Sequence, residues 1–182
     1  MLALVASRAD AQLVSAAPPL CSVAEAAGAI RCSGSWRGNV APQAADVRSQ
    51  IASDWGTLLG ITTSASVTYV GTTDAGSGSG PFAAFANSNA GTLTFDTPQT
   101  GFFVVALKGA NAFSLYLFDG RDAAIGSFRF AMSGVEVNNP GLSNASLFSV
   151  TTPNVVPEPG TYALMATGLA GLGVAARRRR KA

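Results

Sequence analysis

The side chains best suited to catalysis in this sequence are carboxylates. Two Asp or Glu side chains held about 5–10 Å apart in a cleft would suit glycoside hydrolysis. No motif pairs two of them, and the sequence contains no His, which excludes triads with a His base. We therefore expect no catalytic residue and no enzyme. The alternative is a secreted carbohydrate-active enzyme that uses two of the following residues: Glu25, Asp46, Asp54, Asp74, Asp96, Asp119, Asp122 and Glu136.

Three short patterns have the composition of ligand sites but lack a necessary part. Residues 76–80 alternate Gly and Ser without the Lys and the following helix that a phosphate-binding loop needs. Residues 119–122 offer carboxylates to Ca²⁺, but not in the order of an EF-hand loop. Asn144-Ala-Ser146 fits the glycosylation sequon, which matters only in a host with that machinery. We predict turns or loops at the first two positions, and neither a metal nor a cofactor.

Four aromatic side chains, Trp36, Trp55, Tyr69 and Tyr116, have flat faces that could stack on sugar rings. Burial in a core is the commoner use of such residues, and we predict core or rim positions for them. A passive carbohydrate-binding module is the alternative that this set keeps open.

The charge of the chain is concentrated at its C-terminal end. The sequence has 12 Lys and Arg against 10 Asp and Glu, for a net charge of +2. Five of the basic residues form one run, so the remainder has seven basic against ten acidic residues and is mildly acidic. A nucleic-acid-binding face would spread its basic residues among aromatic ones, so we expect no nucleic-acid partner. The basic run consists of Arg177, Arg178, Arg179, Arg180 and Lys181.

Residues 161–176, directly before the basic run, carry no charge and have the composition of a membrane helix. As a helix they would be about 24 Å long, short of the ~30 Å hydrocarbon core. Arg side chains that extend to the interface reduce this shortfall. A buried helix of a globular core is the alternative, but the basic run after it favours a membrane segment with a cytoplasmic end. Residues before 157 would then lie outside the cytoplasm.

Pro157, Glu158 and Pro159 stand just before this segment, and two prolines prevent helical hydrogen bonding there. A Pro-Glu-Pro tripeptide, a short apolar helix and a final basic cluster, in this order, resemble the PEP-CTERM sorting signal of Gram-negative bacteria. The resemblance implies processing near residues 157–159 by an exosortase, a membrane-embedded Cys transpeptidase. It implies transient anchoring in the inner membrane with the passenger in the periplasm, then a cell-surface or extracellular location. An association with exopolysaccharide and biofilm is implied as well.

The N-terminus carries part of an export signal. Residues 1–6 are apolar, but they are shorter than the hydrophobic region of a signal peptide and no basic residue precedes them. Ala9-Asp10-Ala11 has the form of a signal-peptidase site, with Gln12 as the first mature residue. We interpret residues 1–11 as the remnant of a signal peptide that begins upstream.

The two cysteines, Cys21 and Cys32, lie in a stretch that reads as loop. There is no CxxC motif, and two Cys without His do not complete a zinc site. In an exported chain two thiols usually pair, because the compartment is oxidising. We predict a disulfide; the alternative is two separate buried thiols.

Residues 12–152 are expected to form the passenger domain, and residues 153–182 the sorting signal. Apolar residues with helical spacing at 47, 51, 55, 58 and 59 predict a short helix that covers the sheet. Strands are expected within residues 64–70, 91–96, 102–108, 113–118, 127–137 and 147–150, with turns at 109–111 and 119–120 and a β-bulge near Gly134. The predicted fold is mainly β: an antiparallel β-sandwich passenger followed by a single short C-terminal transmembrane helix.

Parts of the passenger also resemble PEP-CTERM proteins, more loosely than the tail does. The Gly38-Asn39 and Trp55-Gly56 pairs are of this kind, as are the strand pair within residues 101–118 and the closing segment 141–148. Asn144 stands where many relatives have His, so no role of that His is carried over. The resemblance favours a structural or binding role for the passenger.

Overall fold

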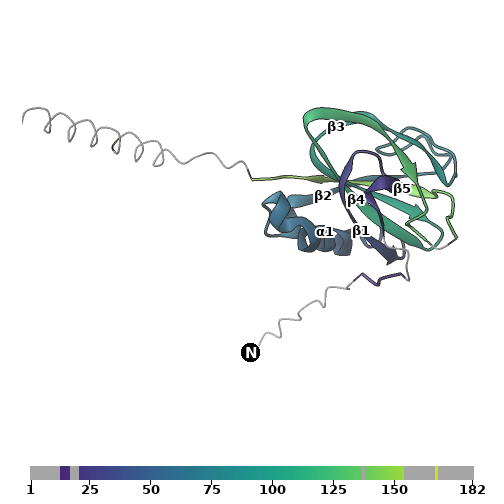
Figure 1. Cartoon of the computed structure of the whole chain (residues 1–182), viewed down its shortest axis with the longest axis horizontal. Coiled ribbons are helices and arrows are strands. Elements are labelled where there is room, and N and C mark those ends of the chain that lie inside the picture. The colour runs from purple at the N-terminus through teal and green to yellow at the C-terminus, as the bar shows by residue number, and fades with distance from the viewer. Residues whose placement is uncertain (1–12, 17–20, 137, 154–166, 168–182) are drawn as a thin grey trace, which may run out of the picture. The chain divides into compact units, whose positions relative to one another are not determined.

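The computed structural model describes residues 13–16, 21–136, 138–153 and 167 (Figure 1). The chain divides into two units, Met1–Thr152 and Pro153–Ala182, and the fold described below is that of the first. The predicted signal remnant and, except for Thr167, the predicted transmembrane helix lie outside the described residues. Within the described ranges no helix is both long and apolar enough to cross a bilayer.

Five strands of the first unit form a single antiparallel sheet, with a helix against it (Figure 1). The strand order is β1-β4-β3-β5-β2, so the last strand in the sequence lies inside the sheet. A mainly antiparallel β fold was predicted and is confirmed, but the strands form one sheet rather than two. The elements are η1 (Val23–Glu25), β1 (Ala29–Arg37), α1 (Ala44–Leu59), η2 (Ser64–Ser66), β2 (Val67–Asp74), β3 (Ala90–Gly109), β4 (Ala112–Ala131) and β5 (Asn144–Val150).

The difference from two sheets lies in the long hairpin of β3 and β4. Each strand has 20 residues, and a two-residue turn at Ala110 and Asn111 joins them, as predicted. The register shifts near Gln99 and Gly101, where Gly101 has a φ of 70° that favours glycine. Figure 1 shows the hairpin arching out of the plane of the sheet. Each arm of this hairpin was predicted as two strands but is one bent strand. The two predicted breaks between those strands are therefore wrong.

The predicted turn at residues 119–120 was one of these boundaries. Asp119 and Gly120 lie inside β4, at the bend, and Gly120 is in register with Gly101. A Cβ on Gly120 would lie 2.8 Å from the carbonyl oxygen of Gln99, so the glycine permits a close approach of two strands. The Asp-Gly pair was wrongly predicted to be a turn. Glycine is common in turns, but it also occurs inside strands where two backbones approach each other closely.

One face of the sheet is covered by α1. Val47, Ile51, Trp55 and Leu59 of the helix are buried against the sheet, which confirms the predicted helix and its apolar face. Leu58 is the exception, because its side chain is 48% exposed. The helix ends at Gly60, whose φ of 67° is the left-handed cap that glycine favours. The sheet side chains of this core include Val104, Ala106, Leu115, Leu117 and Phe148.

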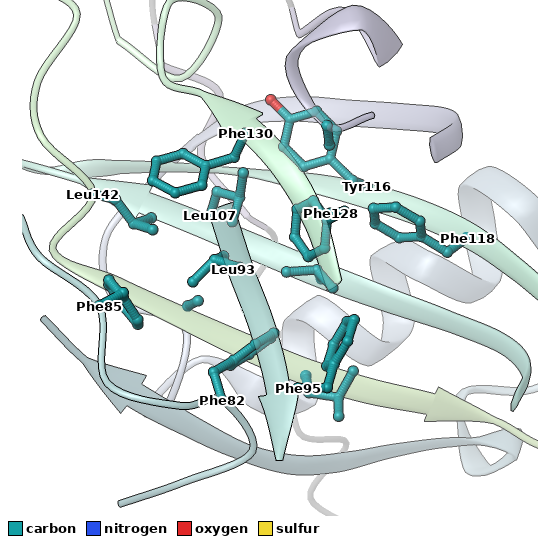
Figure 2. Close-up of a cluster of buried hydrophobic side chains, with 14 of the residues drawn as sticks. Phe82, Phe85, Leu93, Phe95, Leu107, Tyr116, Phe118, Phe128, Phe130 and Leu142 are labelled. Atoms are coloured by element: carbon teal, nitrogen blue, oxygen red, sulfur yellow. The ribbon is translucent and has the colours of Figure 1, made fainter. Parts of the chain in front are cut away.

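The opposite face is covered by the distal half of the same hairpin (Figure 2). Phe103 of β3 and Phe118 of β4 are in register and stack with ring centroids 5.1 Å apart. Phe95, from beyond the bend, packs edge-on against Phe103 at 5.4 Å. The bent hairpin thus supplies the second β layer that a sandwich would take from a separate sheet. Other members of this core are Phe82, Leu93, Leu107, Phe128, Phe130 and Leu147.

The remaining strands differ from the prediction mainly in their limits. β1 was missed, because the segment around Cys32 reads as loop, and β2 begins three residues later than predicted. The last strand is confirmed within β5. Part of the outer edge of β1 is covered by residues 13–16, since the N–H of Ala16 donates to Ser35 and the N–H of Arg37 donates to Val14, both at 2.8 Å.

Candidate functional site

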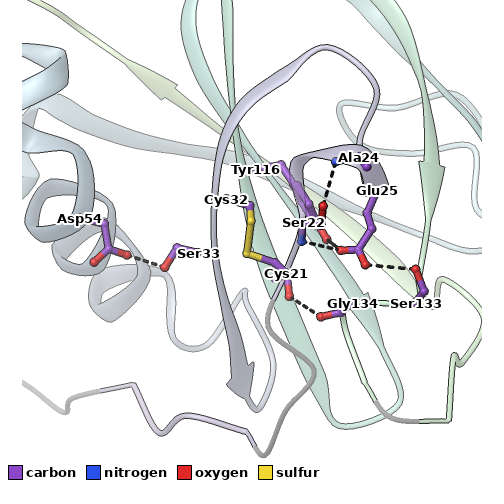
Figure 3. Close-up of a disulfide and its surroundings, with 11 residues drawn as sticks. Cys21, Ser22, Ala24, Glu25, Cys32, Ser33, Asp54, Tyr116, Ser133 and Gly134 are labelled. Atoms are coloured by element: carbon purple, nitrogen blue, oxygen red, sulfur yellow. Dashed lines mark hydrogen bonds between the residues drawn. A yellow bond between two sulfur atoms is a disulfide. The ribbon is translucent and has the colours of Figure 1, made fainter.

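Glu25 is a buried carboxylate of the passenger, with 8% of its surface exposed. Its Oε2 accepts hydrogen bonds from the Tyr116 hydroxyl at 2.9 Å and from the backbone N–H of Ser22 at 3.1 Å. Its Oε1 accepts a hydrogen bond from the Ser133 hydroxyl at 3.1 Å. Figure 3 shows these groups arranged around the carboxylate, beside the disulfide. We call Glu25, Tyr116, Ser133 and Ser22 the Glu25 cluster.

Local sequence explains how Glu25 reaches this position. Ser22 and Glu25 form a capping box on η1, in which the Ser22 hydroxyl accepts from the N–H of Ala24. At the opposite side, a Cβ on Gly134 would overlap the Glu25 carboxylate, so only glycine leaves room for it. The predicted β-bulge near Gly134 is therefore wrong, because β4 ends at Ala131 and Gly134 lies in the following turn.

A disulfide joins Cys21 and Cys32, as predicted, with their Cα atoms 6.0 Å apart. Cys21 directly precedes the capping box, and Cys32 is in register with Tyr116 on the neighbouring strand. The disulfide and the Glu25–Tyr116 hydrogen bond therefore attach the same loop to the same place in the sheet.

The electrostatics of the Glu25 cluster keep its phenol protonated. Burial raises the pKa of Tyr116, and the nearby Glu25 carboxylate raises it further because a phenolate would face a second negative charge. The hydroxyl therefore acts as a hydrogen-bond donor to Glu25. The cluster thereby fixes η1 against β4 across 91 residues of sequence.

The other predicted carboxylates bond to separate partners. Asp54 of α1 accepts from the Ser33 hydroxyl of β1 and, at 2.7 Å, from the Gln50 amide. Asp119 accepts from Arg121 through both oxygens, at 2.9 and 2.7 Å. Glu136 accepts from the backbone N–H of Asn111 at 3.4 Å.

Of the remaining carboxylates, Asp74, Asp96 and Asp122 are exposed and Asp46 is partly exposed. In the part of the chain that the structure describes, no three His, Cys, Asp or Glu side chains come together as a metal site.

At the hairpin bend, residues 119–122 contain an ion pair. The Arg121 guanidinium donates to Asp119 and also lies 4.2 Å above the ring of Phe102. The hydrogen bond from Arg121 lowers the pKa of Asp119. The bidentate pair and the aromatic ring together hold the charged side chains against the bend.

The four aromatic side chains that could have stacked on sugar rings lie in or beside the core, as predicted. Trp55 and Tyr116 are buried, while Trp36 and Tyr69 are partly exposed. All ten Phe residues are buried as well. The sequon of Asn144 lies in β5, where Ser146 is buried, and residues 76–80 form a loop as predicted.

Comparison with known proteins identifies the tail. Residues 155–180 match the family model of the PEP-CTERM protein-sorting motif, which confirms the resemblance seen in the sequence. No curated protein and no solved structure matches the chain. The protein is thus an exported β protein with a C-terminal sorting signal. That signal is a PEP-CTERM motif, which implies membrane anchoring before processing by an exosortase.

The matched segment includes Pro157, Glu158 and Pro159 and the run from Arg177 to Arg180, with Lys181 directly after it. These residues lie outside the described part of the chain. The sequence therefore revealed the sorting motif, whereas it missed the Glu25 cluster. The Ser22-x-x-Glu25 spacing was a visible signal of a capping box, but nothing in it indicated Tyr116 or Ser133.

Proposed function

We propose that this protein is a non-enzymatic component of the cell surface or of an exopolysaccharide matrix, delivered there by exosortase processing. The match of residues 155–180 to the sorting motif is the observation that carries the proposal. The passenger has a structural or binding role, and the tail is its delivery signal. The periplasm is the place of folding, and the Arg-rich end holds the precursor with its passenger outside the cytoplasm.

Each part of the tail has a separate role in anchoring and processing. The basic run stops transfer through the membrane, and the uncharged segment 161–176 anchors the precursor. Pro157 and Pro159 lack the backbone N–H that a helix needs, and prolines of this kind suit a linker that an enzyme can reach. A cysteine thiolate of the exosortase attacks a backbone carbonyl near these residues, and the anchor leaves with the new amino terminus.

Properties of the passenger support a role outside the cell. Its disulfide is suited to an oxidising compartment. Charged residues make up 12% of the sequence, about half of the ~25% that is typical of soluble domains. Polar groups such as Glu25 and Ser133 are engaged in bonds within the fold. These properties favour a durable structural domain.

Processing is tested by expressing the full chain in a host with and without an exosortase and measuring the mass of the released protein. We expect a released passenger that ends within residues 157–159 only when the exosortase is present. Replacing Pro157, Glu158 and Pro159 by Ala should retain the full chain in the membrane. Pro153→Ala is the matched control outside the motif and should be processed normally. Release of a form that keeps residues 160–182 would contradict the proposal.

The structural role is tested against the two carbohydrate alternatives. A screen of the full chain against bacterial polysaccharides measures hydrolysis and binding. We expect no reducing ends to appear. Hydrolysis abolished by Ala replacement of two carboxylates would instead establish the glycosidase, and glycan binding lost on Trp36→Ala would establish a binding module. Co-purification with the producer's exopolysaccharide, reduced when sorting is blocked, tests the matrix association.

A further inference from the structure

Lys108 is a buried cation on the central strand of the sheet. It lies near the end of β3 with 7% of its surface exposed, and its Nζ donates to the carbonyl of Ala110 in the adjacent turn. Among the described residues the ion pair formed is that of Arg121 with Asp119, so no carboxylate neutralises Lys108. A buried ammonium has three donors to satisfy, and one of them is satisfied by the carbonyl of Ala110.

An amide whose oxygen is buried lies opposite this amine. Lys108 of β3 is in register with Asn144 of β5, and directly opposed residues of antiparallel strands have Cβ atoms about 4.5–5.5 Å apart on the same face. The Oδ1 of Asn144 is buried and has no hydrogen-bond partner among the described residues. Such an unsatisfied acceptor is costly to bury. An amine and an amide, each poorly satisfied, therefore face each other across two central strands.

A carboxylate completes this row. Asp74 of β2 is in register with Asn144 from the other side, so Lys108, Asn144 and Asp74 follow one another across β3, β5 and β2. Asp74 is exposed to solvent, which gives protons a route between the row and water. The three groups supply a nucleophile, an acyl group and a proton acceptor.

We propose that Lys108 and Asn144 form an intramolecular isopeptide bond. The Lys108 ammonium rotates away from Ala110 and gives a proton to Asp74, and the neutral Nζ attacks Cγ of Asn144. Nζ passes a second proton to Nδ2, the Cγ–Nδ2 bond breaks, and the released ammonia takes the first proton back from Asp74 and leaves as ammonium. No oxidant or other reactant is needed. The product replaces a buried cation and an unsatisfied amide by one neutral amide, which removes the cost of the buried charge.

The position of the bond gives it a consequence that rests on the proposed function. β5 is hydrogen-bonded on both sides and continues past Val150 toward the sorting motif. A bond at Asn144 would link β5 covalently to β3. Since β5 is the strand that leads to the processed C-terminus, the bond would secure that end of the passenger. The bond itself does not depend on sorting.

Intact mass spectrometry of the denatured, reduced full chain tests the bond. We expect a mass lower than that of the sequence by one ammonia molecule. Lys108 and Lys181 are the two lysines of the chain, so an amine reagent should label Lys181 and leave Lys108 unlabelled. Trypsin should not cut after Lys108, and its peptide should stay joined to the one that contains Asn144. A mass equal to that of the sequence, with Lys108 labelled and cut, would overturn the proposal.

Variants assign the reacting groups. Lys108→Met and Asn144→Ala should abolish the mass deficit, and Asp74→Ala should slow its appearance during refolding. Asn111→Ala, in the neighbouring exposed turn, is the control and should keep the full deficit. A deficit that survives in Lys108→Met or Asn144→Ala would refute the assignment. The mass of the wild-type chain decides the question even where a variant does not fold. The mass deficit should also be present in a chain that no exosortase has processed. The isopeptide proposal can therefore hold even if the sorting proposal fails.

Discussion

The hydroxyl of Tyr116 donates a 2.9 Å hydrogen bond to the carboxylate of Glu25, which precedes it by 91 residues. The two side chains join a short N-terminal turn to a central strand of the sheet, next to the disulfide. Glu25 is buried, and its hydrogen bonds come from two hydroxyl groups and a backbone N–H. The loss of any one donor should therefore lower the free energy of unfolding by a measurable amount.

Tyr116→Phe removes one donor and leaves the rest of the side chain in place. We expect a loss of about 1–3 kcal/mol in the free energy of unfolding, because a buried carboxylate loses a partner that water cannot replace. Urea unfolding at neutral pH measures this. Tyr69→Phe, at a partly exposed position, is the control and should cost less. Equal stability of Tyr116→Phe and the wild type would show that the bond contributes nothing to the fold.

Gly134→Ala should destabilise the protein by about 1–3 kcal/mol, because the new Cβ overlaps the Glu25 carboxylate and overpacking of this size has that cost. Gly78→Ala is a matched control, since a Cβ there meets no atom within 4 Å. The double variant with Glu25→Ala should show a smaller effect of Gly134→Ala than the wild-type background does. Thermal unfolding of the four proteins measures this coupling, and strict additivity would argue against the contact.

Loss of the disulfide should lower stability by about 2–3 kcal/mol, because a cross-link closing a loop of this size restricts the unfolded chain. The double variant Cys21→Ser, Cys32→Ser tests this by urea unfolding. Addition of a reductant should lower the melting temperature of the wild type and leave that of the double variant unchanged. A reductant effect on both proteins would mean that the disulfide is not its cause.

In carboxyl NMR, Asp119 should titrate at a lower pH than an ordinary aspartate does. The hydrogen bond from Arg121 lowers its pKa in the folded state, and Arg121→Gln should return it toward the ordinary value of 3.8. A lowered folded pKa gives stability that is present above the unfolded pKa and is lost as pH falls through the folded one. The contribution is small, because the pair is exposed to solvent. An unchanged Asp119 titration in Arg121→Gln would exclude the ion pair in solution.

Local patterns predicted those parts of the fold that local forces determine. Helical spacing found α1 and its buried face, and the turn at Ala110 and Asn111 followed from its residue types. The bend of the hairpin was misread, because Pro98, Gly101 and Gly120 have the composition of chain reversals. Their positions inside two long strands depend on Phe95 packing back onto Phe103 and on Phe128 packing back onto Phe118, contacts that no local pattern specifies.

The same distinction applies to the sites. The sorting motif is contiguous, so the sequence shows all of it. Nothing local to Lys108 indicates a partner, and only the pairing of β3 with β5 places it opposite Asn144. Likewise, the capping box is visible within four residues, whereas Tyr116 and Ser133 join it through the tertiary fold.

The place of β5 in the strand order sets the timing of folding during export. β2 takes its sheet partner from β5, although 69 other residues separate Asp74 from Asn144. A chain that crosses a membrane from its N-terminus onward delivers β5 last, so β2 waits unpaired and the sheet is complete only when the segment before the sorting motif has emerged. For a chain exported in this direction, the sheet can be completed only after β5 has crossed the membrane, because β2 has β5 as its neighbour in the sheet.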